Sequence, residues 1–411
     1  MKLMFAFVVF GALWVPFATN NHWAFHTWRD IAQQFICFFF PMIAFLSYGR
    51  HLRTMALLIV FIAVYLSIYG MTHVGTGPGS FLKDENDLCL ALVVFLPVPV
   101  FLLYSRRSYL FKAAMVVSIL LILGGIVVTE SRGGFVGLVA VAFYLFYRSR
   151  RKLTILCLVA IVAVSAYCFV PQSYWKEMST IKDTGGGTAK ARMDTWKLAV
   201  KAWSDPKNTL AGVGMGNARW VIGHYELAHA RTEEGRSFAG RAMHSLYMEL
   251  LLDLGVLGVI LFASIVWVSF RGNSRNQLKL NNYFKRLNSV GYYLAKKYRD
   301  VGVVPGGKEE VRLEFEPSPN DLSMEIRKKL ERSCGETMRY IAEAGEMLSA
   351  LNAGWIGVLS AGAFISVLYY PPLWLLAALS ATFHLYIARL SHSLEPFLDC
   401  VENSQLGNET A

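Results

Sequence analysis

The chain has 411 residues, of which 55% are hydrophobic and 14% aromatic, and its formal net charge is +11. A water-soluble domain of this length is more polar, so the composition excludes an ordinary soluble protein. A charge of +11 alone could indicate nucleic-acid binding, but the basic residues are placed as in a membrane protein, so we expect no nucleic-acid partner.

Apolar runs long enough to cross a bilayer recur along the chain, since a helix needs roughly 20 apolar residues to span the hydrocarbon core. The sequence predicts about ten spans, at Leu3 to Ala18, Ile31 to Tyr48, Thr54 to Met71, Leu88 to Tyr104, Tyr109 to Thr129, Phe135 to Tyr147, Leu153 to Val170, Ser245 to Phe270, Ala353 to Tyr369 and Leu373 to Ala388. The sixth run is short and should extend into its flanks. Pro97 and Pro99 should kink the fourth, which a membrane helix tolerates.

Basic residues cluster in alternate short loops, at Arg50, Arg53, Arg106, Arg107, Arg148, Arg150, Arg151 and Lys152. Loops rich in lysine and arginine stay in the cytoplasm. The pattern therefore predicts a cytoplasmic N-terminus, a cytoplasmic segment from Arg271 to Asn352 and a cytoplasmic tail. The loops around His73 and Ser131, and the long loop from Pro171 to Met243, should face outward.

Three polar regions interrupt the apolar runs. Thr72 to Asp87 is rich in glycine and cannot be a regular helix. In the long outer loop, Ala189 to Trp203 has a helical pattern that Asp205-Pro206 should end. In the third region, Asn276 to Tyr298 and Asp321 to Leu351 predict two amphipathic helices, with a turn at Pro305-Gly306-Gly307.

These features predict an all-α polytopic membrane bundle with a large outer loop and a cytoplasmic helical hairpin. Its expected parts are seven spans in 1–170, the outer loop 171–243, an eighth span 244–270, the hairpin insert 271–352, two spans in 353–388 and a tail 389–411. The hairpin's basic residues could touch anionic lipid headgroups, but a solvated face is the simpler interpretation. The six cysteines have no metal or redox spacing, so we interpret them as structural.

The outer loop concentrates residues suited to anionic substrates, with arginines at Arg192, Arg219, Arg231, Arg236 and Arg241, and His244 at its end. Arginine binds phosphate by a planar two-pronged contact and keeps its charge. Histidine is the side chain most easily used as a base near neutral pH. This combination favours transfer chemistry on an anionic, lipid-linked donor.

Arg132 is predicted to lie in a tight outer turn where Gly133 and Gly134 let backbone and lipid headgroup approach closely. It could instead be an interfacial anchor, and Arg192 could be a solvated residue of its helix. His244, at the start of the eighth span, could take a proton from an acceptor hydroxyl, or it could be an interface histidine that hydrogen-bonds locally. Arg241 would share its face if the helix extends backward.

Asp253 lies about 13 Å further along that span by helical rise and off the face of His244, so a structural role with a buried partner is favoured over catalysis. Lys83 could contact a phosphate, with Asn86 and Asp87 ordering the loop. Asp84, Glu85 and Asp87 could form a site for a hard metal ion. However, carboxylates before a helix are more often caps, so we expect no metal and no other cofactor. Gly212 to Gly216 lacks a preceding strand and is interpreted as a backbone turn, not a dinucleotide fingerprint.

Four pieces of the sequence together resemble the O-antigen ligase and polymerase superfamily of bacterial surface-polysaccharide enzymes. They are Gly79 to Asp87 followed by Pro97, Ser131-Arg132-Gly133-Gly134, Ala191 to Trp196 followed by Pro206 and Gly212 to Asn217, and His244 to Tyr247 followed by Asp253 to Gly258. The pattern is especially similar to ligase-like members associated with exosortase systems.

The resemblance implies a C-type glycosyltransferase architecture in the bacterial inner membrane with its active site facing the periplasm. It implies a glycan donor on undecaprenyl pyrophosphate, and an acceptor that is a lipid A core, a protein hydroxyl or another glycan. On this basis His244, Arg192 and Arg132 are the candidate catalytic residues, and Lys83, Arg219, Arg241 and Asn86 are candidates for substrate binding.

Ligase and polymerase differ only in the acceptor, and the sequence does not separate them. A polysaccharide-lipid transporter should carry several polar residues and broken helices near mid-bilayer. The charges here cluster at the outer mouth, which favours an enzyme. A scaffold acting through the cytoplasmic insert is a third possibility.

Overall fold

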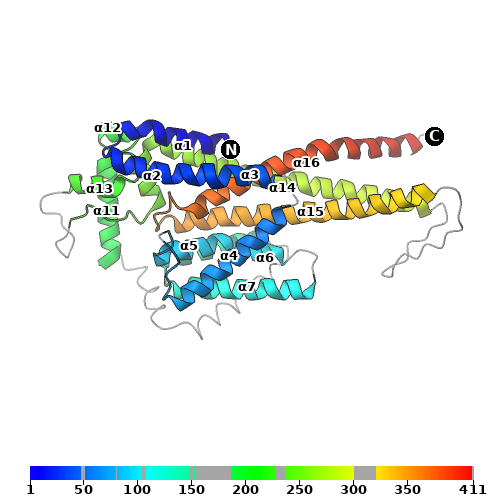
Figure 1. Cartoon of the computed structure of the whole chain (residues 1–411), viewed down its shortest axis with the longest axis horizontal. Coiled ribbons are helices and arrows are strands. Elements are labelled where there is room, and N and C mark those ends of the chain that lie inside the picture. The colour runs from blue at the N-terminus through cyan, green and yellow to red at the C-terminus, as the bar shows by residue number, and fades with distance from the viewer. Residues whose placement is uncertain are drawn as a thin grey trace.

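The computed structural model describes residues 1–47, 51–79, 81–103, 108–148, 152, 187–226, 237–299 and 321–409. Within these ranges the regular structure is helical and contains no strand, which confirms the predicted all-α class. The helices form an elongated bundle in which the longest, α14 (Leu246–Arg299) and α15 (Asp321–Ala361), run side by side (Figure 1).

The first half of the chain supplies α1 (Lys2–Trp14), η1 (Val15–Phe17), α2 (Asn21–Gln34), the π-helix η2 (Phe35–Phe39), α3 (Phe40–Leu46), α4 (Leu52–Thr72), α5 (Glu85–Phe95), α6 (Pro97–Leu102), α7 (Tyr109–Val128) and α8 (Arg132–Arg148). The break between α5 and α6 falls at Pro97, because proline lacks an N–H and fits the first turn of a new helix. The expected kink is confirmed. So is the extension of the sixth apolar run, which is helical from Arg132 to Arg148.

The second half supplies α11 (Gly187–Trp203), α12 (Pro206–Thr209), α13 (Ala218–Val221), η4 (Ile222–Tyr225), α14, α15 and α16 (Pro371–Glu409). The helix predicted in the outer loop is confirmed as α11. The segments Asn276 to Tyr298 and Asp321 to Leu351 are also helical as predicted, as the second part of α14 and most of α15; their amphipathic character and cytoplasmic side stay predictions. The turn predicted at 305–307 and the seventh predicted span lie outside the described residues.

Several predicted spans differ in bounds from the observed helices. The second was predicted at Ile31 to Tyr48, whereas the helical segment there is Asn21–Leu46. The ninth was placed at Ala353 to Tyr369, but α15 ends at Ala361 and residues 362–370 are not regular α-helix. Gly362 follows the last residue of α15 and packs against Leu246. An ideal Cβ added to Gly362 would lie 3.0 Å from the Leu246 Cδ2 atom. Residues 363–369, although mostly apolar, therefore form a non-helical connection from α15 to α16.

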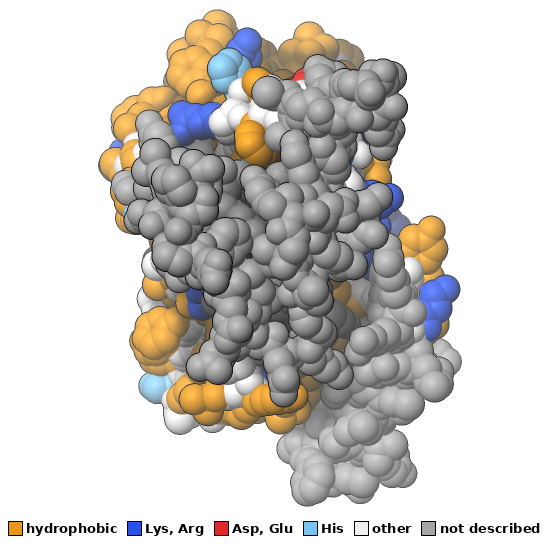
Figure 2. Space-filling model, turned by 90° about the vertical axis from the view of Figure 1, so that its right-hand side faces the viewer, with side chains coloured by type: hydrophobic (Ala, Val, Ile, Leu, Met, Phe, Trp, Pro, Cys, Tyr) orange, Lys and Arg blue, Asp and Glu red, His pale blue; other side chains and the backbone are white. Residues whose placement is uncertain are grey.

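Six helices in the described ranges are long and apolar enough to cross a membrane, namely Asn21–Leu46, Leu52–Thr72, Glu85–Leu102, Tyr109–Val128, Leu246–Ser289 and Pro371–Asp399, with Lys2–Phe17 as a shorter apolar helix. The chain is a multi-pass membrane protein. The count of ten spans stays a prediction. Figure 2 views the molecule from the right-hand end of Figure 1, where Lys and Arg side chains are visible at several places beside hydrophobic ones.

Small residues let α8 lie close to its neighbours, as is common between membrane helices. An ideal Cβ at Gly137 would lie 2.9 Å from the Ala361 Cβ atom, and one at Gly134 would clash with the Cys89 sulfur. Helix α8 therefore packs on both α5 and α15. This contact brings the first residues of α8 to the same end of the bundle as the start of α5.

Helix α14 is broken at Gly255, whose backbone has φ 61° and ψ −164°. Only glycine adopts this conformation readily. The peptide groups around the break bind residues 210–214 instead of the helix. Val213 N donates to Leu252 O (2.9 Å), Gly214 N to Asp253 O (2.9 Å) and Leu257 N to Leu210 O (3.0 Å). The segment between α12 and α13 is thus joined to the membrane bundle through backbone hydrogen bonds.

Asp253 completes this junction. Its buried carboxylate accepts hydrogen bonds from Gly216 N (2.9 Å), Ala218 N (2.6 Å) and the Tyr369 hydroxyl (2.7 Å). A buried charge needs such donors, because burial removes its hydration. The interior partners expected for Asp253 are present, and they come from the glycine turn and from the return before α16.

We predict that Gly255→Ala lowers the melting temperature of the purified protein. An ideal Cβ there would lie 2.6 Å from both Ala211 N and Gly212 N, and the required backbone conformation costs a non-glycine residue about 1–3 kcal/mol before any clash is relieved. Gly345→Ala is the control, because a Cβ at that position meets nothing within 4 Å. A melting temperature for Gly255→Ala equal to that of Gly345→Ala would contradict the assigned break.

Candidate functional site

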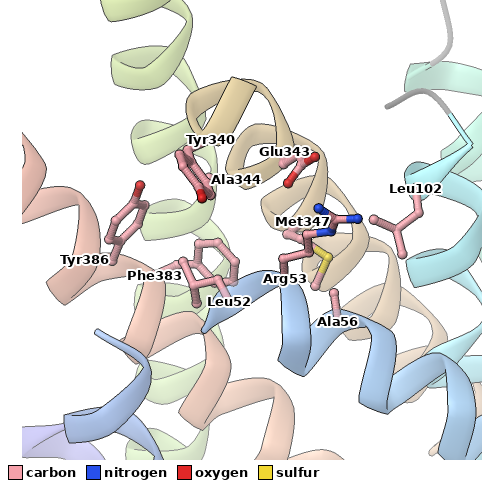
Figure 3. Close-up of a pocket in the computed structure, with 10 residues that line it drawn as sticks. All are labelled: Leu52, Arg53, Ala56, Leu102, Tyr340, Glu343, Ala344, Met347, Phe383 and Tyr386. Carbon is pink, nitrogen blue, oxygen red and sulfur yellow. The ribbon is translucent and has the colours of Figure 1, made fainter. Parts of the chain in front are cut away.

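The predicted site residues come from elements that meet at one end of the bundle, the left end in Figure 1, where α11 and α13 lie. A pocket between α4, α6, α15 and α16 lies toward the opposite end. It is lined by Leu52, Arg53, Ala56, Leu102, Tyr340, Glu343, Ala344, Met347, Phe383 and Tyr386 (Figure 3). Leu52 and Leu102 are at the ends of α4 and α6 remote from the α4–α5 connection. This pocket therefore does not belong to the candidate site.

A chain of hydrogen bonds joins the start of α5 to the start of α8. Asp84 caps α5 by accepting from Asn86 N (2.8 Å), and it also accepts from Asn86 Nδ2 (2.8 Å). Ser131 Oγ donates to Asn86 Oδ1 (2.7 Å) and accepts from Gly134 N (3.1 Å). Asn86 is thus part of the framework that fixes Arg132, the half-buried first residue of α8.

The predicted environment of Arg132 needs correction. Residues 132–134 belong to a helix and not to an open turn. An ideal Cβ at Gly133 would lie 2.8 Å from Ile365 Cγ1, and Gly134 packs on Cys89. These glycines therefore serve helix packing, and they do not face a lipid headgroup.

Helix α11 supplies Arg192 and, one turn later, Trp196, which share a face because residues four apart are neighbours on a helix. The Trp196 indole donates to Met243 O (2.8 Å), the carbonyl just before His244. Trp196 therefore positions the peptide that carries His244 and places the α11 face with Arg192 beside it.

His244 has a positive φ of 46° and is half-buried. Such a conformation costs a non-glycine residue about 1–3 kcal/mol and is often found at functional sites. The residue after next, Leu246, begins α14 and donates its N–H to Gly362 O (2.7 Å), while the Tyr247 hydroxyl donates to Leu359 O (2.7 Å). Hydrogen bonds of Met243 before it and of Leu246 and Tyr247 after it therefore hold the strained backbone of His244.

The expectation that α14 extends backward through Arg241 is wrong, because residues 241–245 are not helical. Arg241 and His244 do not share a helix face. The separation of about 13 Å between His244 and Asp253 assumed a helix from His244 onward. It does not hold as calculated, because α14 begins two residues later, at Leu246. Arg241 lies instead with its guanidinium carbon 5.7 Å from the centre of the Phe238 ring.

Electrostatics connects these residues. Burial, the positive charge of Arg192 and that of Arg241 hold the pKa of His244 below its ordinary value, while Asp84 acts in the opposite direction. Burial and the charge of Arg132 likewise lower the pKa of Arg192, and Asp84 again opposes them. His244 therefore stays neutral near pH 7 within a positive field made by Arg192 and Arg241, and Arg132 acts in turn on Arg192.

The remaining candidates are less central. Lys83 and Arg219 are exposed, and the Arg219 carbonyl accepts from Gly240 N (2.8 Å). Arg231 and Arg236 lie outside the described residues. Among the described side chains, no group of three or more His, Cys, Asp or Glu is arranged to hold a metal ion. Of the proposed metal ligands, Asp84 caps α5 and Asp87 is hydrogen-bonded to Tyr370.

Sequence reasoning missed three contributors to this end of the bundle, namely Tyr369, Tyr370 and the indole of Trp196. The pair Tyr369-Tyr370 falls at the end of a predicted span, where tyrosine is usually an interfacial anchor. Only the non-helical course of 362–370 turns these two residues toward Asp253 and Asp87.

Residues 117–263 match the family described as O-Antigen ligase. No curated protein matches the chain. The matched segment contains Arg132, Arg192 and His244, and three of the four sequence pieces that carry the resemblance. Members of this family are membrane glycosyltransferase-like enzymes, ligases or polymerases. Residues 117–263 of the chain therefore form an O-antigen ligase domain.

Proposed function

We propose that the chain transfers a glycan from undecaprenyl pyrophosphate to an acceptor hydroxyl at the periplasmic face of the bacterial inner membrane, as an O-antigen ligase does. The observation that carries the proposal is an electrostatic series at one end of a membrane bundle, in which Arg192 acts on a neutral His244 and Arg132 acts on Arg192. A neutral base and a pair of fixed cations are what this transfer needs.

The two arginines would bind the pyrophosphate of the donor. In the reaction the bond between the anomeric carbon and the pyrophosphate oxygen breaks, and its electron pair leaves with undecaprenyl pyrophosphate. Negative charge grows on that leaving oxygen in the transition state, where preorganised cations stabilise it most. Arg192 and Arg132 come from different helices. Trp196 anchors α11 to the carbonyl of Met243, and Ser131, just before α8, accepts from Gly134 N in its first turn.

His244 would be the general base. The acceptor oxygen forms the new bond to the anomeric carbon, and its proton passes to the imidazole. The protonated imidazole then returns the proton to solvent. A base of this kind typically contributes about a hundredfold to ten-thousandfold in rate. The lowered pKa of His244 keeps it in the neutral, proton-accepting form.

A polymerase of the same superfamily would use the same donor site and another lipid-linked repeat unit as acceptor. Transfer assays with purified protein separate the two. A lipid A core or protein acceptor elongated in one step indicates a ligase, whereas growth of the lipid-linked chain itself indicates a polymerase. A polysaccharide-lipid transporter is favoured less, because the break in α14 at Gly255 is filled by the outer loop.

The proposed orientation of the bundle in the membrane can be tested by labelling. We expect a cysteine at Ala239 to be labelled by an impermeant maleimide from outside intact spheroplasts, in a variant whose six natural cysteines are replaced. A cysteine at Asn288, exposed on distal α14, should be labelled only after permeabilisation. The opposite result would invert the topology and exclude a periplasmic site.

We predict that Arg192→Lys lowers kcat/KM for the lipid-linked donor by about tenfold to a hundredfold, because lysine keeps the charge but cannot make the two-pronged contact. Arg132→Lys should behave similarly. Arg275→Lys, on exposed distal α14, is the control and should be unchanged. Normal transfer by both site variants at normal expression would contradict the pyrophosphate clamp.

We predict that His244→Gln removes most single-turnover transfer while donor binding persists, because glutamine keeps a hydrogen bond but is no useful base. His224→Gln, at an exposed histidine of the same outer segment, should retain activity. In the wild type, kcat/KM should fall on the acid side only below about pH 6.5, since burial and the arginines lower the pKa of the His244 imidazole. Near-normal transfer by His244→Gln would make His244 an orienting residue instead.

A further inference from the structure

Two exposed tryptophans stack on each other at the same end of the molecule as the candidate site. Trp23 belongs to α2 and Trp220 to α13, and their ring centres lie 5.8 Å apart with 23° between the planes. They remain 45% and 41% exposed, respectively. Helices α2 and α13 both lie at the left end of the bundle in Figure 1. A large aromatic surface is therefore open beside the outer loop.

Backbone contacts hold this pair in place. Asn20 caps α2 by accepting from Trp23 N (3.1 Å), and Asn217 Nδ2 donates to Asn20 O (3.2 Å), which joins the start of α2 to the residue before α13. Gly240 lies against Trp220, since an ideal Cβ there would be 3.0 Å from Trp220 Cζ3. The surface is formed before any ligand arrives, which lowers the entropy cost of binding.

The pair has polar neighbours. His22 lies edge-on to Trp23, with ring centres 5.9 Å apart, and its ring centre is 4.3 Å from that of His26. Arg219 directly precedes Trp220 and is exposed. A flat aromatic surface bordered by hydrogen-bonding side chains suits a sugar, whose ring has an apolar C–H face and a hydroxyl edge. The C–H groups carry partial positive charge and are attracted to the negative face of the indole.

The tryptophan pair also lies close to the candidate site along the sequence. Gly240, which contacts Trp220, is only four residues before His244, and four residues span at most about 14 Å even when fully extended. A glycan whose reacting sugar lies at His244 would therefore bring its following sugar rings within reach of the pair.

We propose that Trp23 and Trp220 form a glycan subsite, which binds the sugar rings of the donor beyond the one that reacts. The inference rests on the proposed function for the identity of the donor, and it adds a binding site for the glycan that is separate from the arginines for the pyrophosphate. The pair would act mainly on affinity, because it contacts a part of the donor where no bond changes.

The test measures dissociation constants of the full chain in nanodiscs for three probes. They are undecaprenyl pyrophosphate alone, the same carrier bearing a tetrasaccharide, and the free tetrasaccharide at millimolar concentration. Trp220→Ala and Trp23→Ala should each weaken binding of the two glycan probes by about two- to tenfold and leave the bare carrier unchanged. Trp220→Phe should retain most of the affinity. Trp267→Ala, at a tryptophan 63% exposed on α14, is the matched control and should change none of the three.

Two outcomes would overturn the subsite. Equal weakening for the bare and the glycan-bearing carrier would make the pair a membrane-interface anchor, and unchanged binding of both glycan probes would leave the pair without a glycan role. Failure of the bare carrier to bind the wild type, while the free tetrasaccharide binds through the tryptophans, would contradict the proposed donor and not the subsite.

Discussion

The arrangement of the segment from α11 to α13 depends on one buried carboxylate in a broken membrane helix. Asp253 lies just before the break at Gly255 and accepts three hydrogen bonds from outside its own helix. An unpaired charge inside a membrane protein is costly. Each of these donors therefore stabilises the docking of the glycine turn 212–216 and of residue 369 against α14. With the turn docked, α11 is held over the start of α14, and Trp196 can reach the carbonyl before His244.

The same electrostatics links binding to chemistry in the proposed function. Besides burial, Arg192, which would hold the pyrophosphate, lowers the pKa of His244. A bound pyrophosphate brings negative charge into this field and offsets the arginines. The imidazole would then become a stronger base when the donor is present. The positive φ of His244 costs backbone energy. Such strain is consistent with a residue whose side chain must be held in one position for function.

Much of this could be predicted from the sequence because it depends on local patterns. The helical pattern of Ala189 to Trp203 and the Asp205-Pro206 stop predicted α11, and the arginines of the predicted outward loops indicated Arg132 and Arg192. The errors arose where distant segments decide the local structure. The glycines after Arg132 were assigned to lipid contact, but they pack on Cys89 and Ile365 from other helices. The break at Gly255 depends on backbone hydrogen bonds to residues 210–214, some forty residues earlier. The sequence of α14 alone therefore does not predict this break. The non-helical course of 362–370 was likewise hidden by its apolar composition.

The central claim is that Arg132 and Arg192 hold a lipid-linked pyrophosphate next to His244. A cryo-EM structure of the chain in a nanodisc with undecaprenyl pyrophosphate tests it most directly. The account predicts pyrophosphate density within hydrogen-bonding distance of both guanidinium groups, at the end of the bundle formed by the starts of α5, α8 and α14. Density for the pyrophosphate at the opposite end, for instance near Arg53 and Tyr340, would contradict it.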